Sequence, residues 1–269
     1  MASTNLAHRL RTATDALLAR PAAGSRRPRF DLEESFFARK RLTKILKREG
    51  ATYRTAEPFP HVVIDDFMEK GALRVVLEES SRIAPEHWKS RSRDTEIKSS
   101  LEEESSFGAF SWKLFQTLNS GHFLTFLERL TGIDGLIADP HLRGGGLHEI
   151  RRGGKLDVHA DFNFHKRLKL YRRLNLLLYL NRGWAEEWGG HLELWDRGLT
   201  RCARRILPVF NRAVIFDTSN YSFHGHPTPL SCPDDRSRKS VALYYYSVEC
   251  PSEDDKTPHT TVFRQVPGH

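Results

Sequence analysis

The second half of this chain is a series of short segments in which apolar and polar residues alternate, and this pattern constrains the fold more than any other feature. From Gly144 onward these segments are separated by turns rich in Gly, Pro, Asn and Asp. Alternation with period two is typical of strands that have one buried face. Eight strands are expected, at residues 146–152, 156–159, 173–181, 189–195, 203–208, 212–217, 222–227 and 239–247. Eight strands at this spacing predict a jelly roll or double-stranded β-helix, with two sheets facing each other around a pocket.

The first half of the chain has a different period, which indicates helices. Apolar residues recur at helical spacing in several stretches, and a short apolar run indicates one strand between them. The expected helices are 6–17, 36–50, 70–83 and a pair within 110–130 that is divided at Asn119–Gly121, and the expected strand is 58–66. We therefore predict a mainly β fold with α-helices that buttress one sheet. The expected domains are a helical segment at 1–57, a main domain at 58–250 with its strand core at about 144–248, and a polar C-terminal tail at 251–269.

The chain carries a net charge of +8, and its acidic and basic residues are well mixed. Such a balance favours an ordinary solvated surface over a nucleic-acid-binding surface, although a phosphate-bearing partner stays possible. Basic residues are concentrated in 165–173, and residues 88–107 are charged and rich in serine. Both segments are expected to be loops at the rim of the pocket, and the second could act as a lid.

Several features of the sequence indicate in which cellular compartment the protein is expected. No stretch is long and apolar enough to span a bilayer, and the first residues lack the apolar core of a signal peptide. The Arg- and Ala-rich segment 1–24 favours an amphipathic helix over a transit segment. The three cysteines, Cys202, Cys232 and Cys250, have no spacing that indicates disulfides or a metal site. A reducing, cytoplasmic location is therefore expected.

One set of polar residues indicates a metal site. His159 and Asp161 are two residues apart in an expected strand, so their side chains share one face. His224 lies in a later expected strand and can supply a second imidazole. Two histidines and one carboxylate form a set that suits iron(II) and leaves coordination positions open. His226 shares the strand face of His224, so spacing alone leaves both as candidates for the second histidine ligand.

The segment from Leu147 to Ser247 resembles the iron(II)- and 2-oxoglutarate-dependent oxygenases, and specifically their prolyl-4-hydroxylase-like branch. The runs that carry this resemblance begin with His159-Ala-Asp161-Phe-Asn and end with Arg238-Lys-Ser240-Val-Ala-Leu-Tyr244. Between them lie Arg173-Leu-Asn-Leu-Leu-Leu-Tyr179-Leu-Asn181, Trp188-Gly-Gly-His-Leu-Glu-Leu-Trp195, Pro208-Val-Phe-Asn-Arg212-Ala-Val-Ile-Phe216 and His224-Gly-His-Pro.

The resemblance implies roles for individual residues. His159, Asp161 and His224 would bind iron(II), and the family pattern favours His224 over His226 because the ligand stands immediately before Gly225. Arg238 would bind the far carboxylate of the cosubstrate 2-oxoglutarate, Tyr179 would donate a hydrogen bond to the same carboxylate, and Asn175 would border the cosubstrate. Oxygen would be the second cosubstrate, with ascorbate as a supporting reductant. Halogenating relatives have a small residue in place of the carboxylate, so Asp161 favours hydroxylation.

The expected function is therefore hydroxylation of an aliphatic C–H bond, with a prolyl or other amino-acid side chain, in a peptide, in a protein or free, as the preferred substrate. The same chemistry on a small metabolite, a glycan intermediate or a nucleobase is the alternative. A cupin-like binding or sensing module without turnover is a further alternative, which the complete ligand set disfavours. Tyr244, Trp195 and Asn163 are candidates for contact with the substrate. No membrane partner is expected, and the pattern makes no prediction of oligomeric state.

Overall fold

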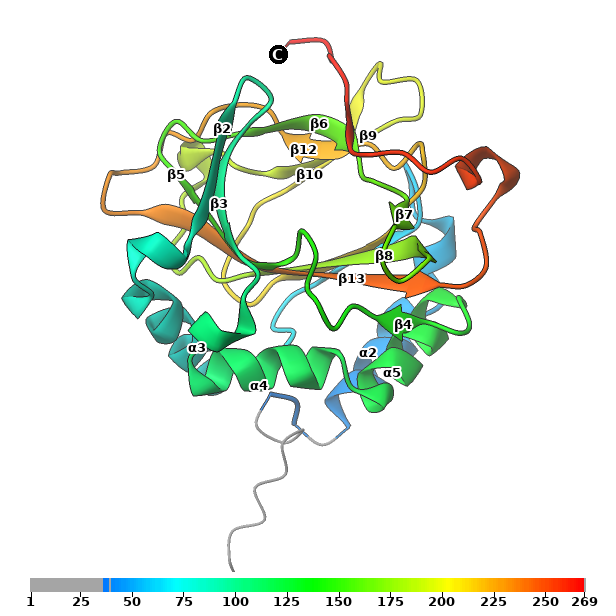
Figure 1. The fold of residues 1–269 in the computed structure, drawn as a ribbon, viewed down its shortest axis with the longest axis horizontal. Helices are drawn as coiled ribbons and strands as arrows, with labels where there is room; N and C mark the ends of the chain where they lie inside the picture. Colours follow the sequence, from blue (N-terminus) through cyan, green and yellow to red (C-terminus); the bar gives the residue numbers. More distant parts are fainter. Residues whose placement is uncertain (1–35, 39, 269) are drawn as a thin grey trace, which may run out of the picture. The chain divides into compact units, whose positions relative to one another are not determined.

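Two layers of β-strands face each other, and a group of helices covers the outer side of one layer (Figure 1). The computed structural model describes residues 36–38 and 40–268, so the helix expected at 6–17 lies outside the described residues. The helices are α2 (Arg41–Glu49), α3 (Lys70–Arg82), α4 (Ala109–Leu118) and α5 (Gly121–Thr131). The strands before the expected core are β1 (His61–Ile64), β2 (Lys89–Arg93), β3 (Glu96–Leu101) and β4 (Ile137–Ala138).

All eight expected strands of the core are present. They are β5 (Gly146–Arg151), β6 (Leu156–Ala160), β8 (Leu170–Tyr179), β9 (Leu192–Trp195), β10 (Cys202–Ile206), β11 (Ala213–Asp217), β12 (His224–His226) and β13 (Ser237–Ser247). Two further strands are very short, namely β7 (Phe164–His165) and β14 (Val262–Phe263). The prediction of a double-stranded β-helix with helical buttresses is confirmed.

The strands form one continuous, curled antiparallel sheet. Its order is β1-β11-β8-β13-β5-β3-β6-β12-β9-β10. β8 and β13 lie next to the helices, whereas β6, β12 and β9 lie in the opposite layer, and β5 and β3 connect the two layers (Figure 1). The curl therefore brings β6 and β12 across the interior from β8 and β13.

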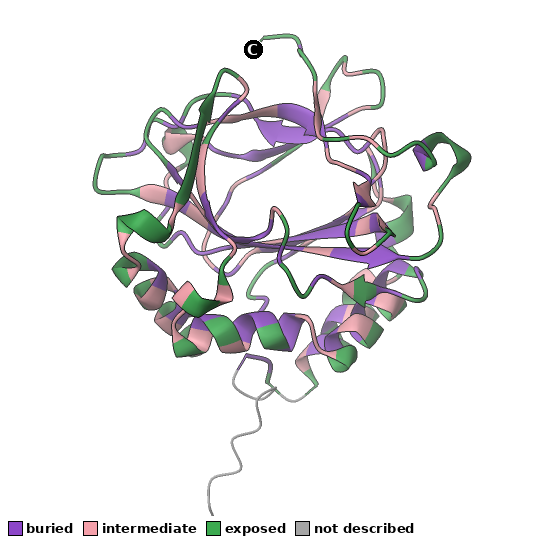
Figure 2. Ribbon diagram, viewed as in Figure 1, coloured by how far each residue is buried: buried purple, intermediate pink, exposed green. Residues whose placement is uncertain are grey.

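Alternation along β8 and β13 divides their side chains between two environments. Leu174, Leu176 and Leu178 of β8 belong to the large hydrophobic core that also contains residues of α3, α4 and α5. The intervening Asn175 and Leu177 face the interior between the two layers, where they line a cavity. Figure 2 shows the strands of both layers as largely buried. One face of this layer thus stabilises the fold, and the other is available for function.

Local interactions define the ends of the helices. The Ser120 hydroxyl accepts a hydrogen bond from the backbone N–H of Phe123 at the start of α5, and Gly132 ends α5 with a left-handed backbone at φ 75°. At the start of α4, the Glu79 carboxylate of α3 accepts hydrogen bonds from the backbone N–H groups of Phe110 (2.9 Å) and Ser111 (2.7 Å). A side chain of one helix therefore caps the next helix.

Two segments differ from the expectation. Residues 89–101 were expected to be a loop, but they form the β2–β3 hairpin, in which every residue of β2 is exposed. The polar segment after Pro251 packs against the strands, and its β14 pairs with β6, with Val262 opposite Ala160 and Phe263 opposite His159. Both segments therefore lie beside β6, which carries His159 and leads directly into Asp161.

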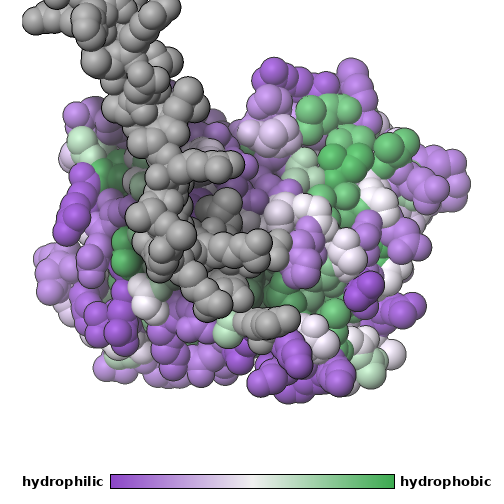
Figure 3. All heavy atoms as spheres, turned by 90° about the horizontal axis from the view of Figure 1, so that it is seen from below, coloured by the Kyte–Doolittle hydropathy of each residue, from purple (hydrophilic) through white to green (hydrophobic). Residues whose placement is uncertain are grey.

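The helical side of the molecule presents both polar and apolar side chains. Figure 3 shows hydrophobic residues gathered among hydrophilic ones on this face. Trp112 of α4 is 47% exposed. Among the described residues, no helix has the length and apolar character needed to cross a membrane.

Candidate metal and cosubstrate site

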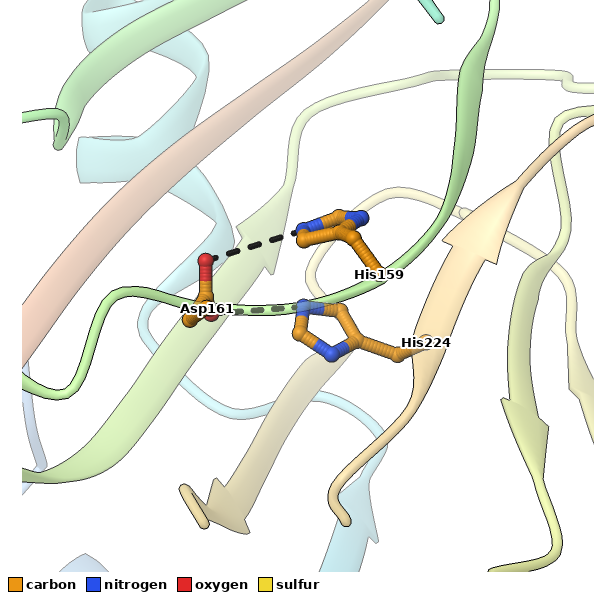
Figure 4. A group of neighbouring side chains, drawn as sticks. All are labelled: His159, Asp161 and His224. Carbon is orange, nitrogen blue, oxygen red and sulfur yellow. Dashed lines mark ion pairs between the residues drawn. The ribbon is translucent and has the colours of Figure 1, made fainter. Parts of the chain in front are cut away.

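Three of the expected site residues come together at two neighbouring strands, β6 and β12, in the layer opposite β8 and β13. His159 of β6 lies directly opposite His224 of β12 in the antiparallel pairing, and the two imidazole centroids are 4.5 Å apart. Asp161 follows the end of β6, and its carboxylate oxygens lie 3.6 Å from Nε2 of His159 and 3.4 Å from Nε2 of His224 (Figure 4). Residues opposite each other in an antiparallel pair share a face, so strand pairing itself creates the cluster.

Gly225 allows β12 to lie close to β6 at this point. A Cβ atom at Gly225 would lie 2.8 Å from the carbonyl oxygens of both Leu156 and Asp157. A larger residue would therefore force the two strands apart and separate the two histidines.

Backbone hydrogen bonds prepare both imidazoles for metal binding. Nδ1 of His159 lies 2.8 Å from the carbonyl oxygen of Asp157, and Nδ1 of His224 lies 2.9 Å from that of Ser222. A carbonyl oxygen only accepts, so each Nδ1 carries the proton and each Nε2 presents a lone pair to the cluster. Burial lowers the pKa of His224 to about 4, and the neighbouring His159 contributes to this shift, so this ring is neutral at ordinary pH. The donor set thus fits a divalent iron ion.

Asp161 is held by two side chains that sequence reasoning did not link to it. Its Oδ2 forms an ion pair with Nη2 of Arg172 (2.9 Å) and accepts a hydrogen bond from Nδ2 of Asn175 (2.7 Å). Burial alone would raise the pKa of Asp161, but the Arg172 guanidinium and then the two imidazoles hold that pKa well below its usual range. The carboxylate is therefore ionised and fixed in orientation, as a metal ligand requires.

A β-bulge explains why Arg172 points toward this site. β13 pairs Tyr245 with Leu174 but the next residue, Tyr246, with Arg172, so Arg173 is an extra residue in β8. The bulge reverses the alternation, and Arg172 faces the interior instead of the helices. Its guanidinium lies 3.4 Å from the Tyr244 ring centroid and its side chain is only 1% exposed. The sequence pattern predicted a basic loop at 165–173, and a strict period of two gives no signal for this inward orientation.

Arg238 occupies the inner end of the site as a buried cation. Its Nε donates to the carbonyl oxygen of Gly190 (2.8 Å), and its Nη2 donates to the Tyr179 hydroxyl (3.3 Å). Among the described residues no acidic side chain pairs with it, and burial lowers its pKa. A buried guanidinium with only neutral partners is costly, so the arrangement fits a ligand that brings its own carboxylate.

Two cavities meet at the metal-binding cluster. An inner cavity of about 70 Å³ contains Arg238, Asn175 and His224 in its lining, and an outer cavity of about 600 Å³ opens toward the β2–β3 hairpin and the segment around β14. His159, Asp161 and Tyr244 line both cavities. A small ligand in the inner cavity and a larger one in the outer cavity would therefore meet at His159 and Asp161.

Of the three residues expected to contact the substrate, one lines the cavities and two do not. Tyr244 lines both, as noted above. Trp195 is buried in a hydrophobic cluster with Val158 and Phe223, and its indole N–H donates to Glu193. Asn163 holds the C-terminal segment, because its amide donates to the carbonyl oxygens of Asp255 and Thr257. Neither Trp195 nor Asn163 is among the residues that line the two cavities.

Comparison with known proteins agrees with this geometry. Residues 145–246 match the 2OG-Fe(II) oxygenase superfamily. The chain contains a 2OG-Fe(II) oxygenase domain. The matched segment includes the three residues of the candidate metal cluster together with Arg172, Asn175, Tyr179 and Arg238. Iron(II) and 2-oxoglutarate are accordingly the metal and the cosubstrate of this oxygenase domain, and the residues described above fit both.

Individual proteins are similar to this chain in sequence or in fold. Prolyl 3-hydroxylase OGFOD1 of Mus musculus is 32% identical over 79 residues, which are 28% of this chain and 14% of that protein. The chain thus spans only a small part of this curated relative. A Pseudomonas putida prolyl-4-hydroxylase has a TM-score of 0.56 at 15% identity, over 77% of this chain and 98% of that one. A Trichoplax adhaerens prolyl hydroxylase, solved with a peptide fragment of hypoxia inducible factor, has a TM-score of 0.56 at 16% identity, over 80% and 96% of the two chains. The oxygenase domain therefore has the prolyl-hydroxylase fold.

Proposed function

We propose that this protein is an iron(II)- and 2-oxoglutarate-dependent dioxygenase that hydroxylates an aliphatic C–H bond of a prolyl or other amino-acid side chain. The observation that carries the proposal is the junction of two cavities at His159 and Asp161. When bound, iron and 2-oxoglutarate supply the oxidising chemistry at this junction. The protein supplies the fixed ligands, the cation for the cosubstrate carboxylate and the space in which the substrate is oriented.

A peptide or protein segment is the preferred substrate. The outer cavity is large, and its wall includes the exposed hairpin strand β2, whose outer edge makes no strand pairing within the described residues. An unpaired strand edge can receive an extended peptide through backbone hydrogen bonds. The solved Trichoplax structure, which has the same fold, contains a peptide fragment.

The charges of the outer cavity favour a substrate with an acidic group near the oxidised carbon. Arg91, Arg93, Lys98, Arg143 and Arg172 line it, together with the acidic residues Glu96, Glu102 and Asp161. Glu96 is already paired with Lys98, and Asp161 is paired with Arg172. The unbalanced charge of the cavity is therefore positive, which favours a negatively charged partner.

The experiment that tests the function uses the purified chain without oxygen. Iron(II) and 2-oxoglutarate together should give a weak visible charge-transfer band, and a folded protein that gives none would contradict the proposal. With oxygen, succinate formation should increase when prolyl peptides are added, and more with glutamate than with glutamine beside the proline. An increase with small metabolites and none with peptides would favour the alternative substrate class.

A further inference from the structure

His226 is a buried histidine that neither the metal site nor the core accounts for. It ends β12, two residues after the metal-binding His224, and it is only 3% exposed. Its side chain lines the inner cavity together with Arg238, Lys98 and Ser240. It lies outside the metal-binding cluster, which among the described residues consists of His159, Asp161 and His224.

Both ring nitrogens of His226 lack a hydrogen-bond partner among the described residues. This distinguishes it from its neighbours, because His159, His224 and His148 each have a ring nitrogen bonded to a backbone carbonyl. Buried polar groups are almost always hydrogen-bonded, so an imidazole with two unsatisfied nitrogens at a cavity wall indicates a missing partner inside that cavity.

The surroundings of His226 define the charge of that partner. Two cationic side chains, Arg238 and Lys98, line the same inner cavity as His226. A neutral imidazole offers one N–H donor and one acceptor. Arg238 forms no ion pair with an acidic side chain among the described residues, so the group that completes this end of the cavity is an anion.

We propose, on the basis of the function proposed above, that His226 donates a hydrogen bond to the same 2-oxoglutarate carboxylate that Arg238 binds. Arg238 already uses Nε for Gly190 and one Nη2 hydrogen for Tyr179. Its remaining N–H groups cover one edge of a carboxylate, which has about four acceptor positions. His226 satisfies a further position and selects for a 2-oxoacid that ends in a carboxylate.

The test compares two ligands that differ only in that distal group. The anaerobic iron(II) protein is titrated with 2-oxoglutarate and with 2-oxopentanoate, and the visible band reports binding of either 2-oxoacid. His226→Leu should weaken the binding of 2-oxoglutarate about 10- to 100-fold, as expected for loss of a hydrogen bond to a charged group. The same substitution should leave the binding of 2-oxopentanoate unchanged. His226→Gln, which keeps an N–H donor, should recover most of the affinity for 2-oxoglutarate.

Two control variants bracket these results. Arg238→Leu should also weaken the binding of 2-oxoglutarate but not that of 2-oxopentanoate. Replacement of the exposed His122 of α5 by leucine should change the binding of neither ligand. Unchanged binding of 2-oxoglutarate by His226→Leu would overturn the inference while the proposed function stands. Equal weakening of both ligands would also overturn it, because that result indicates a packing role. A wild-type protein that binds no 2-oxoglutarate would overturn both.

A second measurement needs no folded leucine variant. In the zinc(II)-loaded wild-type protein, the proton NMR signal of the His226 imidazole N–H can be assigned by its absence from the spectrum of His226→Gln. Addition of 2-oxoglutarate should shift this signal and slow its exchange with water. No change on saturation would contradict a hydrogen bond between His226 and the carboxylate.

Discussion

The carboxylate of Asp161 contacts both the histidines of the cluster and the side chains that hold it in place. Oδ2 forms the ion pair with Arg172 and accepts the hydrogen bond from Asn175, and it also lies 3.4 Å from Nε2 of His224. Oδ1 lies 3.6 Å from Nε2 of His159. The residue is thus both a proposed metal ligand and the counter-ion of a buried guanidinium. This double role makes Asp161 more sensitive to replacement than a metal ligand with no such partner.

Asp161→Ala should reduce oxygen-coupled succinate formation by more than about 100-fold, because loss of a ligand exceeds the usual effect of losing an outer hydrogen-bond partner. It should also lower thermal stability in the metal-free protein, since Arg172 loses its acidic partner. Succinate assays and thermal melts measure the two effects. Asp134→Ala, an exposed aspartate before β4, is the matched control. Substantial turnover by Asp161→Ala would exclude this residue as a ligand.

At the scale of elements, the helices are connected to one another by specific side chains as well as by apolar packing. Glu79 of α3 accepts hydrogen bonds from Phe110 and Ser111 at the start of α4, including one from the Ser111 hydroxyl. This carboxylate therefore also interacts favourably with the positive end of the α4 dipole.

Glu79→Ala should lower the free energy of unfolding by about 1–2 kcal/mol, the usual effect of losing an N-terminal cap. Urea unfolding measures this change. Glu78→Ala is the matched control, because Glu78 is the exposed neighbour on the same helix and should change stability by less than about 0.5 kcal/mol. Equal effects of the two substitutions would show that the contact with α4 contributes nothing.

The sequence predicted regular elements well and their irregularities poorly. All eight core strands were expected, because alternation and turn residues act locally along each of them. Arg172 was missed because one extra residue in β8 reverses the alternation, and a bulge depends on pairing with β13. β14 was missed because Val262 and Phe263 are two apolar residues in a polar segment, and only their contact with β6 makes them a strand.

For the molecule as a whole, one buried acid outside the site predicts how stability varies with pH. Asp217 of β11 accepts a hydrogen bond from the Tyr53 hydroxyl at 2.6 Å, and burial raises its pKa to about 6. In the unfolded chain an aspartate has a pKa near 3.9. Between about pH 4 and 6 the folded state therefore binds the extra proton, so this group destabilises the fold increasingly as pH rises to about 6, and by a constant amount above it.

Asp217→Asn removes this ionisation. The free energy of unfolding of the variant, relative to the wild type, should increase by about 1–2 kcal/mol between pH 4.5 and pH 7.5. Urea unfolding at the two pH values measures the difference, and Asp134→Asn provides a control with an exposed carboxylate. A difference that does not vary with pH would mean that Asp217 has an ordinary pKa.

The pairing of β14 with β6 has a consequence for biosynthesis. The three metal ligands and Arg238 precede Thr260, Thr261 and Phe263 in the chain, yet these later residues form part of the wall of the outer cavity. The Phe263 ring packs against His159, with 5.4 Å between the ring centroids. During translation the ligands therefore emerge from the ribosome before their cover does. A nascent chain can thus meet iron while one side of the site is still open, and β14, which is synthesised after the ligands, closes that side.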